Sequence, residues 1–212
     1  MNSDKAQPSE MAALVESFDW AATTAGAKAD WSPALRTMVG TMLASNHPML
    51  IWWGPELIQF YNDGYRATMG PERHPSALGQ PGRECWQEIW PIIGPQIESV
   101  MAGGPSTWHE DQLVPVTRHG SLQDVWWTYG YSPIPLADGT IGGVLVVCTD
   151  VTGAHLAQVR LSKEVERRRY ENERQRIMFQ QAPGFTCVLA GPNHVFEFAN
   201  DAYNLLIGKR DV

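Results

Sequence analysis

The sequence predicts an α+β fold, and three observations lead to that class. Five short apolar segments have the character of β-strands, and the helical segments among them are grouped between the second and third strands. The stretch Pro48–Gly70 has the pattern of a strand, a turn, a second strand and a short helix. An Asp138-Gly139 pair, typical of a β-hairpin, separates the last two strands. Hairpins with segregated helices are typical of an α+β domain.

Pro48–Gly70, with the sequence PMLIWWGPELIQFYNDGYRATMG, is the stretch around which the chain is organised. Met49–Trp53 and Leu57–Tyr61 are apolar and aromatic runs that suit buried strands, and the Gly-Pro dipeptide between them predicts a turn. Asn62 or Asp63 can cap the following helix, because either side chain accepts hydrogen bonds from free backbone N–H groups. The final glycine closes the helix ahead of a proline.

The same pattern returns in Gly184–Gly208, with the sequence GFTCVLAGPNHVFEFANDAYNLLIG. The Asn62-Asp63 pair corresponds to Asn200-Asp201, and the second turn is one residue longer. A repeat of this length predicts a second copy of a domain rather than a solenoid.

Two helices are predicted ahead of the first strand. Ser9–Phe18 suits a short amphipathic helix. A second helix begins at Ser32-Pro33, with serine as the cap and proline in the first position. Apolar residues follow at the spacing of one helix face, which we expect to be buried. They are Leu35, Met38, Val39, Met42 and Leu43.

The middle of the chain contains two predicted helices and three predicted strands. Arg83–Trp90 and Pro95–Met101 are the helices. Ser106–Thr117 is a strand candidate with a proline near its end, which suits an edge strand or a bulge. Val125–Ile134 is a long aromatic strand, and Ile141–Val147 is apolar enough to be a central one.

Gly153–Met178 is predicted to be a helical linker, because it is rich in Ala, Leu, Gln, Glu and Arg and contains no proline. Its apolar residues lie toward its ends, and its polar middle does not form a clean heptad pattern. A parallel two-stranded coiled coil is the preferred interpretation. A solvated single helix is the alternative.

Composition excludes several classes of function. A net charge of −7 over 212 residues argues against nucleic acid as the main partner. Cys85, Cys148 and Cys187 are far apart and show no zinc-binding spacing, which predicts no metal site and fits a reducing compartment. No apolar run approaches the length of a membrane span, so we expect no membrane segment in this chain and a cytoplasmic location.

These features resemble a PAS sensor domain followed by the opening of a second one. The hairpin, the Asn-Asp-x-Tyr helix start and the closing glycine match the beginning of a PAS fold. Asp150-Val151-Thr152 matches the Asp-x-Thr with which PAS domains hand over to a signalling helix. The resemblance implies a five-stranded antiparallel sheet with helices on one face, an N-terminal helical extension and a C-terminal signalling helix. The chain is similar to the sensor regions of bacterial histidine kinases.

The expected organisation therefore has four parts. They are an N-terminal helical extension, a PAS domain, a helical coiled-coil linker and the start of a second, incomplete PAS domain, at residues 1–46, 47–152, 153–178 and 179–212.

No catalytic motif is present in the sequence, since GxSxG, HExxH and P-loop patterns are all absent. We therefore expect this chain itself to carry no enzymatic activity and no catalytic residues. The resemblance implies that a full-length parent could be a protein histidine kinase.

A flavin cofactor remains open, and none is required by the sequence. Cys85 lies where blue-light PAS relatives carry a flavin-reactive cysteine, but its neighbours Glu84 and Trp86 do not match their pattern. Cys148 replaces the glutamine with which those relatives contact the flavin. The residues argue against haem, because the helix that would supply a histidine contains none and only His74 and His109 remain nearby.

Aromatic residues are concentrated in the predicted PAS domain, where a ligand would lie between the sheet and the helices. Aromatic side chains with a few polar groups suit an apolar or planar small molecule. The alternative is that the rings fill the core or a dimer interface. The candidate lining residues are Trp53, Phe60, Tyr65, Trp86, Trp90, Trp127 and Tyr129.

The sequence thus predicts a sensory and dimerisation module of a bacterial signalling protein, with a two-component histidine kinase as the expected parent. The expected partners are a second copy of the chain, a downstream kinase or other output domain, and a small-molecule ligand. Asp150 and Thr152 would transfer the signal to the linker helix. Two alternatives stay open: a purely structural spacer domain that binds nothing, and a flavin-binding redox or light sensor.

Overall fold

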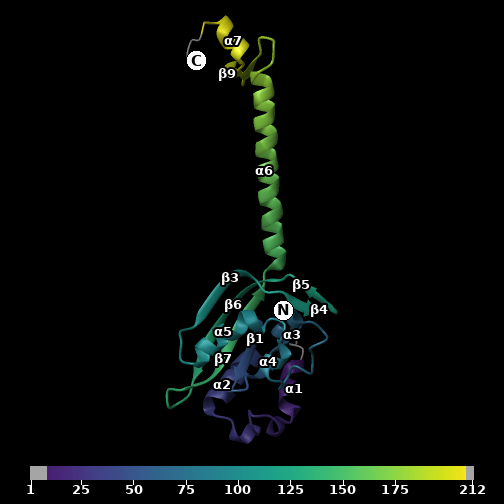
Figure 1. Ribbon diagram of the computed structural model, residues 1–212, viewed down its shortest axis with the longest axis vertical. Helices are drawn as coiled ribbons and strands as arrows, with labels where there is room; N and C mark the ends of the chain where they lie inside the picture. Colours follow the sequence, from purple (N-terminus) through teal and green to yellow (C-terminus); the bar gives the residue numbers. More distant parts are fainter. Residues whose placement is uncertain (1–8, 209–212) are drawn as a thin grey trace, which may run out of the picture. The chain divides into compact units, whose positions relative to one another are not determined.

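The computed structural model describes residues 9–208 (Figure 1). The chain divides into two compact units, Met1–His155 and Leu156–Val212, and the boundary falls in the first turn of helix α6 (Thr152–Gln180). Each unit is described by itself.

A five-stranded antiparallel sheet forms the centre of the first unit, in the order β2-β1-β7-β6-β3. The predicted sheet is therefore confirmed, and its most apolar strand, β7, is central as expected. The strands are β1 (Met49–Trp53), β2 (Ile58–Tyr61), β3 (Thr107–Leu113), β6 (Trp126–Pro135) and β7 (Ile141–Asp150).

The strand predicted over Ser106–Thr117 is an edge strand with a bulge, as expected, but its predicted end is wrong, because the chain changes direction at Pro115. β3 ends at Leu113, and β4 (Val116–Arg118) pairs instead with β5 (Ser121–Gln123) in a separate two-stranded ribbon. Proline has no N–H group to donate to a strand neighbour, so it ends the pairing with β6. The ribbon becomes a structural element of its own beside the sheet.

Two N-terminal helices begin at serine caps, of which the one at Ser32 was predicted. α1 (Glu10–Ser17) is capped by Ser9, which accepts a hydrogen bond from the Ala12 N–H at 2.9 Å. α2 (Pro33–Ala44) is capped by Ser32 in the same way, at 3.1 Å from the Leu35 nitrogen. Two short 3-10 helices, η1 (Trp20–Ala22) and η2 (Lys28–Asp30), connect them.

These N-terminal segments cover one face of the sheet. The Trp20 ring stacks on Phe60 with 4.2 Å between ring centroids, and Trp31 meets the same ring edge-on at 5.3 Å. Ile51 lies opposite Phe60 in the strand register and is fully buried beside it. The helical extension therefore packs on the sheet of its own chain.

The other face of the sheet is covered by α3 (Asp63–Met69), α4 (Gly82–Cys85) and α5 (Trp90–Met101), of which α5 packs on β6 and β7. α3 begins at the predicted Asn62 cap. The boundaries predicted for the next two helices are wrong. α5 starts at Trp90, because a proline in its first turn needs no N–H partner, and it continues past Pro95. α4 is a single turn.

In the second unit, the predicted linker helix is confirmed as α6, which exceeds the expected range by one residue at its start and two at its end. Within its described length none of its residues is buried, and Arg167 and Arg168 pair with glutamates one turn away. The repeated hairpin is also present. It consists of β8 (Cys187–Ala190), β9 (Val195–Ala199) and α7 (Asp201–Leu206), the last capped by Asn200.

Candidate functional site

A cavity of about 60 Å³ lies between the sheet and the helices α3, α4 and α5 of the first unit. This is several times the roughly 10–15 Å³ that a single water requires. Strand alternation puts Trp127, Tyr129 and Tyr131 of β6 on this face, beside Val146 and Cys148 of β7. The remaining lining residues are Trp52, Tyr65, Thr68, Met69, Trp86, Ile89, Ile93, Val114 and Val116.

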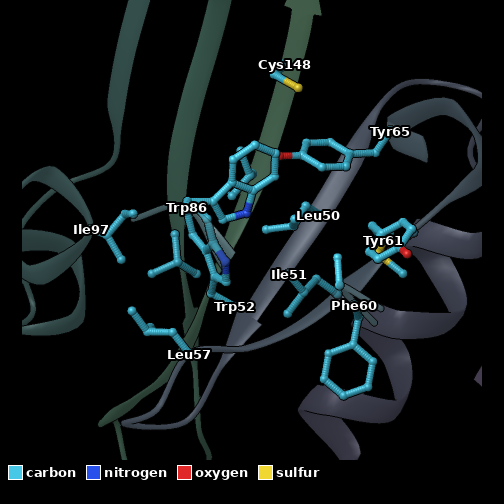
Figure 2. Packing of buried hydrophobic residues seen from close by; sticks show 14 of the residues in the cluster. Leu50, Ile51, Trp52, Leu57, Phe60, Tyr61, Tyr65, Trp86, Ile97 and Cys148 are labelled. Atoms are coloured by element: carbon cyan, nitrogen blue, oxygen red, sulfur yellow. The ribbon is translucent and has the colours of Figure 1, made fainter. Parts of the chain in front are cut away.

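Four of the seven predicted lining residues surround this cavity: Tyr65, Trp86, Trp127 and Tyr129. Figure 2 shows the Tyr65 hydroxyl directed toward the cluster that contains Trp86 and Trp52. The Tyr65 and Trp86 rings meet edge-on at 6.3 Å.

The other three predicted residues lie elsewhere. Phe60 is on the opposite face of the sheet against Trp20, and Figure 2 shows it pointing away from the Trp52 and Trp86 rings. Trp53 shares the face of Phe60, because successive side chains of a strand point to opposite faces. Trp90 is buried on α5 behind Trp52, with 6.3 Å between the ring centroids, and does not reach the cavity.

Trp52 and Tyr131 were missed by sequence reasoning. Tyr131 could have been found, because it is two residues beyond Tyr129 on the same strand and must share its face. The choice between Trp52 and Trp53 depends on which face of β1 meets α3–α5, and an apolar run carries no such signal. Both faces of β1 are buried, so its sequence lacks the alternation of apolar and polar residues that would identify the face toward the helices.

Gln59, a fully buried side chain on β2, holds two of the cavity's indoles. Its Oε1 accepts hydrogen bonds from Trp86 Nε1 at 2.6 Å and from Trp52 Nε1 at 3.3 Å. Its Nε2 donates to the Ala77 carbonyl at 3.1 Å. One amide therefore fixes the ring orientations on two walls, which a sequence scan for aromatic residues does not reveal.

The cavity's cysteine is a neutral thiol. Burial raises the pKa of Cys148 to about 12, although the nearby Arg118 guanidinium acts in the opposite direction. Cys85 is half-buried outside the lining, and burial raises the pKa of its thiol as well. Thiols held in the protonated form are poor nucleophiles, so neither position has the environment of a reactive cysteine.

A polar path leads from the cavity wall to the start of α6. The Arg118 guanidinium stands 5.0 Å from the ring centroid of Trp127, and its Nη1 donates to Asp150 Oδ2 at 2.8 Å. Asp150 Oδ1 accepts from the Thr152 N–H at 3.0 Å, and Thr152 Oγ1 accepts from the Trp126 N–H at 3.0 Å. The two residues predicted to transfer a signal thus connect the β4–β5 ribbon, β6 and α6.

The pKa of Asp150 lies below its usual range. Burial alone would raise it, but the hydrogen bonds from Thr152 and Arg118 favour the charged carboxylate more strongly. The carboxylate therefore stays ionised at the root of the helix throughout the neutral range.

His155 attaches the first turn of α6 to the sheet. Its Nδ1 lies 2.7 Å from Asp111 Oδ2, and its ring stacks on Trp126 with 4.3 Å between centroids. Asp111 sits in a bulge of β3 with a φ of +50°, a left-handed conformation that aspartate adopts more readily than most residues. The start of the helix is therefore held by β3, β6 and the β4–β5 ribbon together.

Residues 9–208 contain neither a metal-ligand cluster nor a helix that could cross a membrane. No group of three or more His, Cys, Asp or Glu side chains in this range is arranged to hold a metal ion. Among the described helices, none is both long and apolar enough to cross a membrane.

Comparison with known families gives one match. Residues 56–156 match a family model described as the PAS fold, which spans β2 through β7 and the root of α6. No curated protein matches the chain.

Three solved structures similar to the chain are distant from it in sequence. An RNA-binding light-oxygen-voltage receptor is 15% identical with a TM-score of 0.46; the match covers 65% of this chain and 38% of the receptor. A sensory box sensor histidine kinase from Vibrio cholerae is 18% identical with a TM-score of 0.37, covering 56% and 87%. A PAS domain from Colwellia psychrerythraea is 14% identical with a TM-score of 0.43, covering 56% and 98%.

Proposed function

This chain carries a PAS domain, and on that premise we propose that it binds a small molecule in the cavity and relays the binding to α6. A ligand can shift a conformational equilibrium only through contacts that differ between two states. Val114 and Val116 line the cavity on either side of Pro115, and Arg118 lies on the same strand as Val116, β4. Arg118 also holds Asp150, so a displacement of this ribbon acts directly on the helix root.

The bond between Arg118 and Asp150 is the observation that carries this proposal. It joins the β4–β5 ribbon, which contributes Val116 to the cavity wall, to Asp150, the last residue of β7, two residues before α6 begins. A ribbon of two three-residue strands is easier to displace than the five-stranded sheet. A ligand in the cavity would therefore displace the β4–β5 ribbon first, and the ribbon would transmit this displacement to α6.

Native mass spectrometry of the full chain tests for the ligand. We expect a small bound mass in the wild-type protein and its loss in Val116→Leu, which places a larger side chain at the cavity wall. Thr117→Val, a neighbouring substitution that does not line the cavity, is the matched control. A mass equal to the bare chain in all three proteins would favour the purely structural role.

The flavin alternative is separated by absorbance between about 350 and 500 nm, where a flavin absorbs. Pockets for drug-sized ligands measure about 300–1,000 Å³. The cavity of about 60 Å³ in this conformation suits a smaller, colourless molecule. Absorbance in that range from the purified protein would reverse this preference.

We also propose that the module acts as a homodimer and controls a downstream output domain, such as that of a histidine kinase, in the cytoplasm. Leu156, Lys163, Tyr170 and Ile177 recur every seven residues along α6, and the three apolar members are exposed. The polar middle of α6 still forms no clean heptad, but one heptad position is apolar in three of four repeats, which supports a parallel coiled coil with Lys163 as a polar position in the seam. We assign no catalytic role to this chain.

A further inference from the structure

Two tyrosine hydroxyls at the cavity make no hydrogen bond within residues 9–208. Tyr65 is 9% exposed and Tyr131 is 3% exposed, and both line the cavity. The third cavity tyrosine differs, since the Tyr129 hydroxyl accepts a hydrogen bond from Gln96 Nε2 at 3.2 Å. Neither hydroxyl oxygen is among the fully buried, unpartnered polar atoms of the described chain, although both side chains are largely buried and line the cavity. Both oxygens therefore have accessible surface, and an occupant of the cavity could give them the hydrogen-bond partner that they lack.

Apart from the weakly polar Cys148 thiol, the other side-chain polar groups of the cavity wall have partners within the described chain. The indole N–H groups of Trp52 and Trp86 donate to Gln59, and that of Trp127 donates to the Val114 carbonyl at 3.2 Å. The Thr68 hydroxyl donates to the Tyr65 carbonyl at 2.7 Å. The Tyr65 and Tyr131 hydroxyls are thus the groups that can form hydrogen bonds with a molecule in the cavity.

The cavity wall carries no charge. Its lining includes no Asp, Glu, Lys, Arg or His, and burial raises the pKa of Tyr65 and Tyr131, so both hydroxyls keep their protons. Arg73 and Arg118 stand behind the rings of Trp86 and Trp127, where Glu88 and Asp150 neutralise them. A charged occupant would lose its hydration without gaining a counter-ion.

Resting on the proposed sensory role, we propose that the cavity takes a neutral, planar aromatic molecule of about one ring that carries a hydrogen-bonding group. The Trp52, Trp86 and Trp127 rings provide flat apolar walls. The Tyr65 and Tyr131 hydroxyls bond the polar group, since each can donate and accept. The small cavity limits the number of rings.

Phenol, toluene and benzoate test the chemistry, because the first two share a shape and benzoate adds a negative charge. Titration calorimetry of the full chain should show phenol binding about tenfold more tightly than toluene, the value of one good hydrogen bond. Benzoate should not bind at millimolar concentration. Tyr65→Phe and Tyr131→Phe should each reduce the preference for phenol while leaving toluene binding unchanged.

Tyr129→Phe is the matched control, because its hydroxyl already has Gln96 as a partner. It should keep the full preference for phenol. Equal affinities for phenol and toluene in the wild-type protein, binding of benzoate, or an unchanged preference in both Tyr65→Phe and Tyr131→Phe would each overturn the proposal. If none of the three probes binds, the proposal is overturned too.

The same samples separate this inference from the sensory role. If phenol binds as expected but does not alter hydrogen exchange in the peptide 150–155, the ligand class stands and the relay to α6 fails. If a cavity substitution alters exchange there but phenol does not bind, the relay stands and the ligand class fails.

Discussion

Asn62 is the residue that ties the first hairpin to its helix. Its Oδ1 accepts hydrogen bonds from the backbone N–H groups of Tyr65 and Met49, at 2.9 and 3.1 Å. Its Nδ2 lies within 3.0 Å of three carbonyls that precede β1, those of Met42, Ser45 and His47. One buried amide thus caps α3 and closes the entry to β1.

Asn200 repeats this network in the second unit. Its Oδ1 accepts from the Tyr203 and Thr186 N–H groups, at 2.9 and 3.0 Å. Its Nδ2 donates to the Gly184 and Ala182 carbonyls, at 2.6 and 3.2 Å. The sequence repeat is therefore a repeat of hydrogen bonds, with one extra residue between the asparagine and its upstream partners.

Replacing Asn62 by Ala should lower the free energy of unfolding by about 3 kcal/mol, more than a simple cap, because buried backbone groups on both sides lose their partner. Asn62→Asp keeps the acceptor and should cost less than the alanine variant. Asp63→Ala is the control, since its only backbone hydrogen bond in the described chain is a 3.3 Å contact with Met11 N. Urea melts rank the three variants, and an Asp63 cost equal to that of Asn62 would refute the role.

Asp150 should make stability at the helix root pH-dependent. Its folded pKa is depressed, so its contribution is fully present above the unfolded value of about 3.9 and disappears as pH falls through the folded value. Asp150→Asn should cost about 2 kcal/mol at pH 7, because it leaves Arg118 without a charged partner. In melts from pH 7 to 3, the gap between the proteins should shrink below about pH 4. A constant gap would contradict this.

At the scale of elements, the two copies of the hairpin differ in burial. β1 and β2 are covered on both faces, whereas β8 and β9 expose Val188, Leu189, Val195 and Phe196 by 42–63%. An isolated hairpin is marginally stable in water. The two copies therefore provide an internal comparison of the same local sequence pattern.

Backbone amides of β8–β9 should exchange with solvent at least about 100-fold faster than those of β1–β2, because only the first hairpin is locked in a sheet and a core. Hydrogen exchange resolved by NMR measures both hairpins in one sample. Equal protection would mean that the second hairpin is stabilised by contacts outside the described residues.

The elements that sequence predicts well are those with local signals. The serine cap at Ser32, the asparagine cap at Asn62 and the Gly-Pro turn each reflect a few neighbouring residues, and all three are present. Two predictions are wrong for a shared reason: the strand predicted to continue across Pro115, and the helix predicted to begin only at Pro95, whereas α5 begins at Trp90. A proline marks a possible break, but whether the chain bends or continues depends on tertiary packing.

The candidate site was only half predictable for a similar reason. Tyr65, Trp86, Trp127 and Tyr129 follow from aromatic enrichment in a domain that encloses a cavity. Choosing between Trp52 and Trp53 requires the pairing register of β1, which decides the face of the sheet that each side chain occupies. Recognising the role of Gln59 requires knowing that the indoles of Trp52 and Trp86 both donate hydrogen bonds to it. Long-range pairing of this kind leaves no trace in a single sequence.

For the whole molecule, we expect a dimer formed through α6. Light scattering of the full chain at micromolar concentration should give about twice the chain mass of 23.6 kDa. Substituting Lys for Leu156 and Ile177 should produce a monomer, because it places charge at seam positions, while Leu161→Lys, outside the seven-residue repeat, should not. A monomeric mass for the wild-type chain would exclude the coiled coil.

The central claim is that filling the cavity changes the root of α6. Its most direct test is hydrogen exchange of the peptide 150–155 in Val116→Leu, with Thr117→Val as the control. Because the ribbon joins the cavity to Asp150 through Arg118, we predict altered deuterium uptake in this peptide for Val116→Leu alone. Unchanged uptake there, with any effect confined to residues 114–123, would contradict the account.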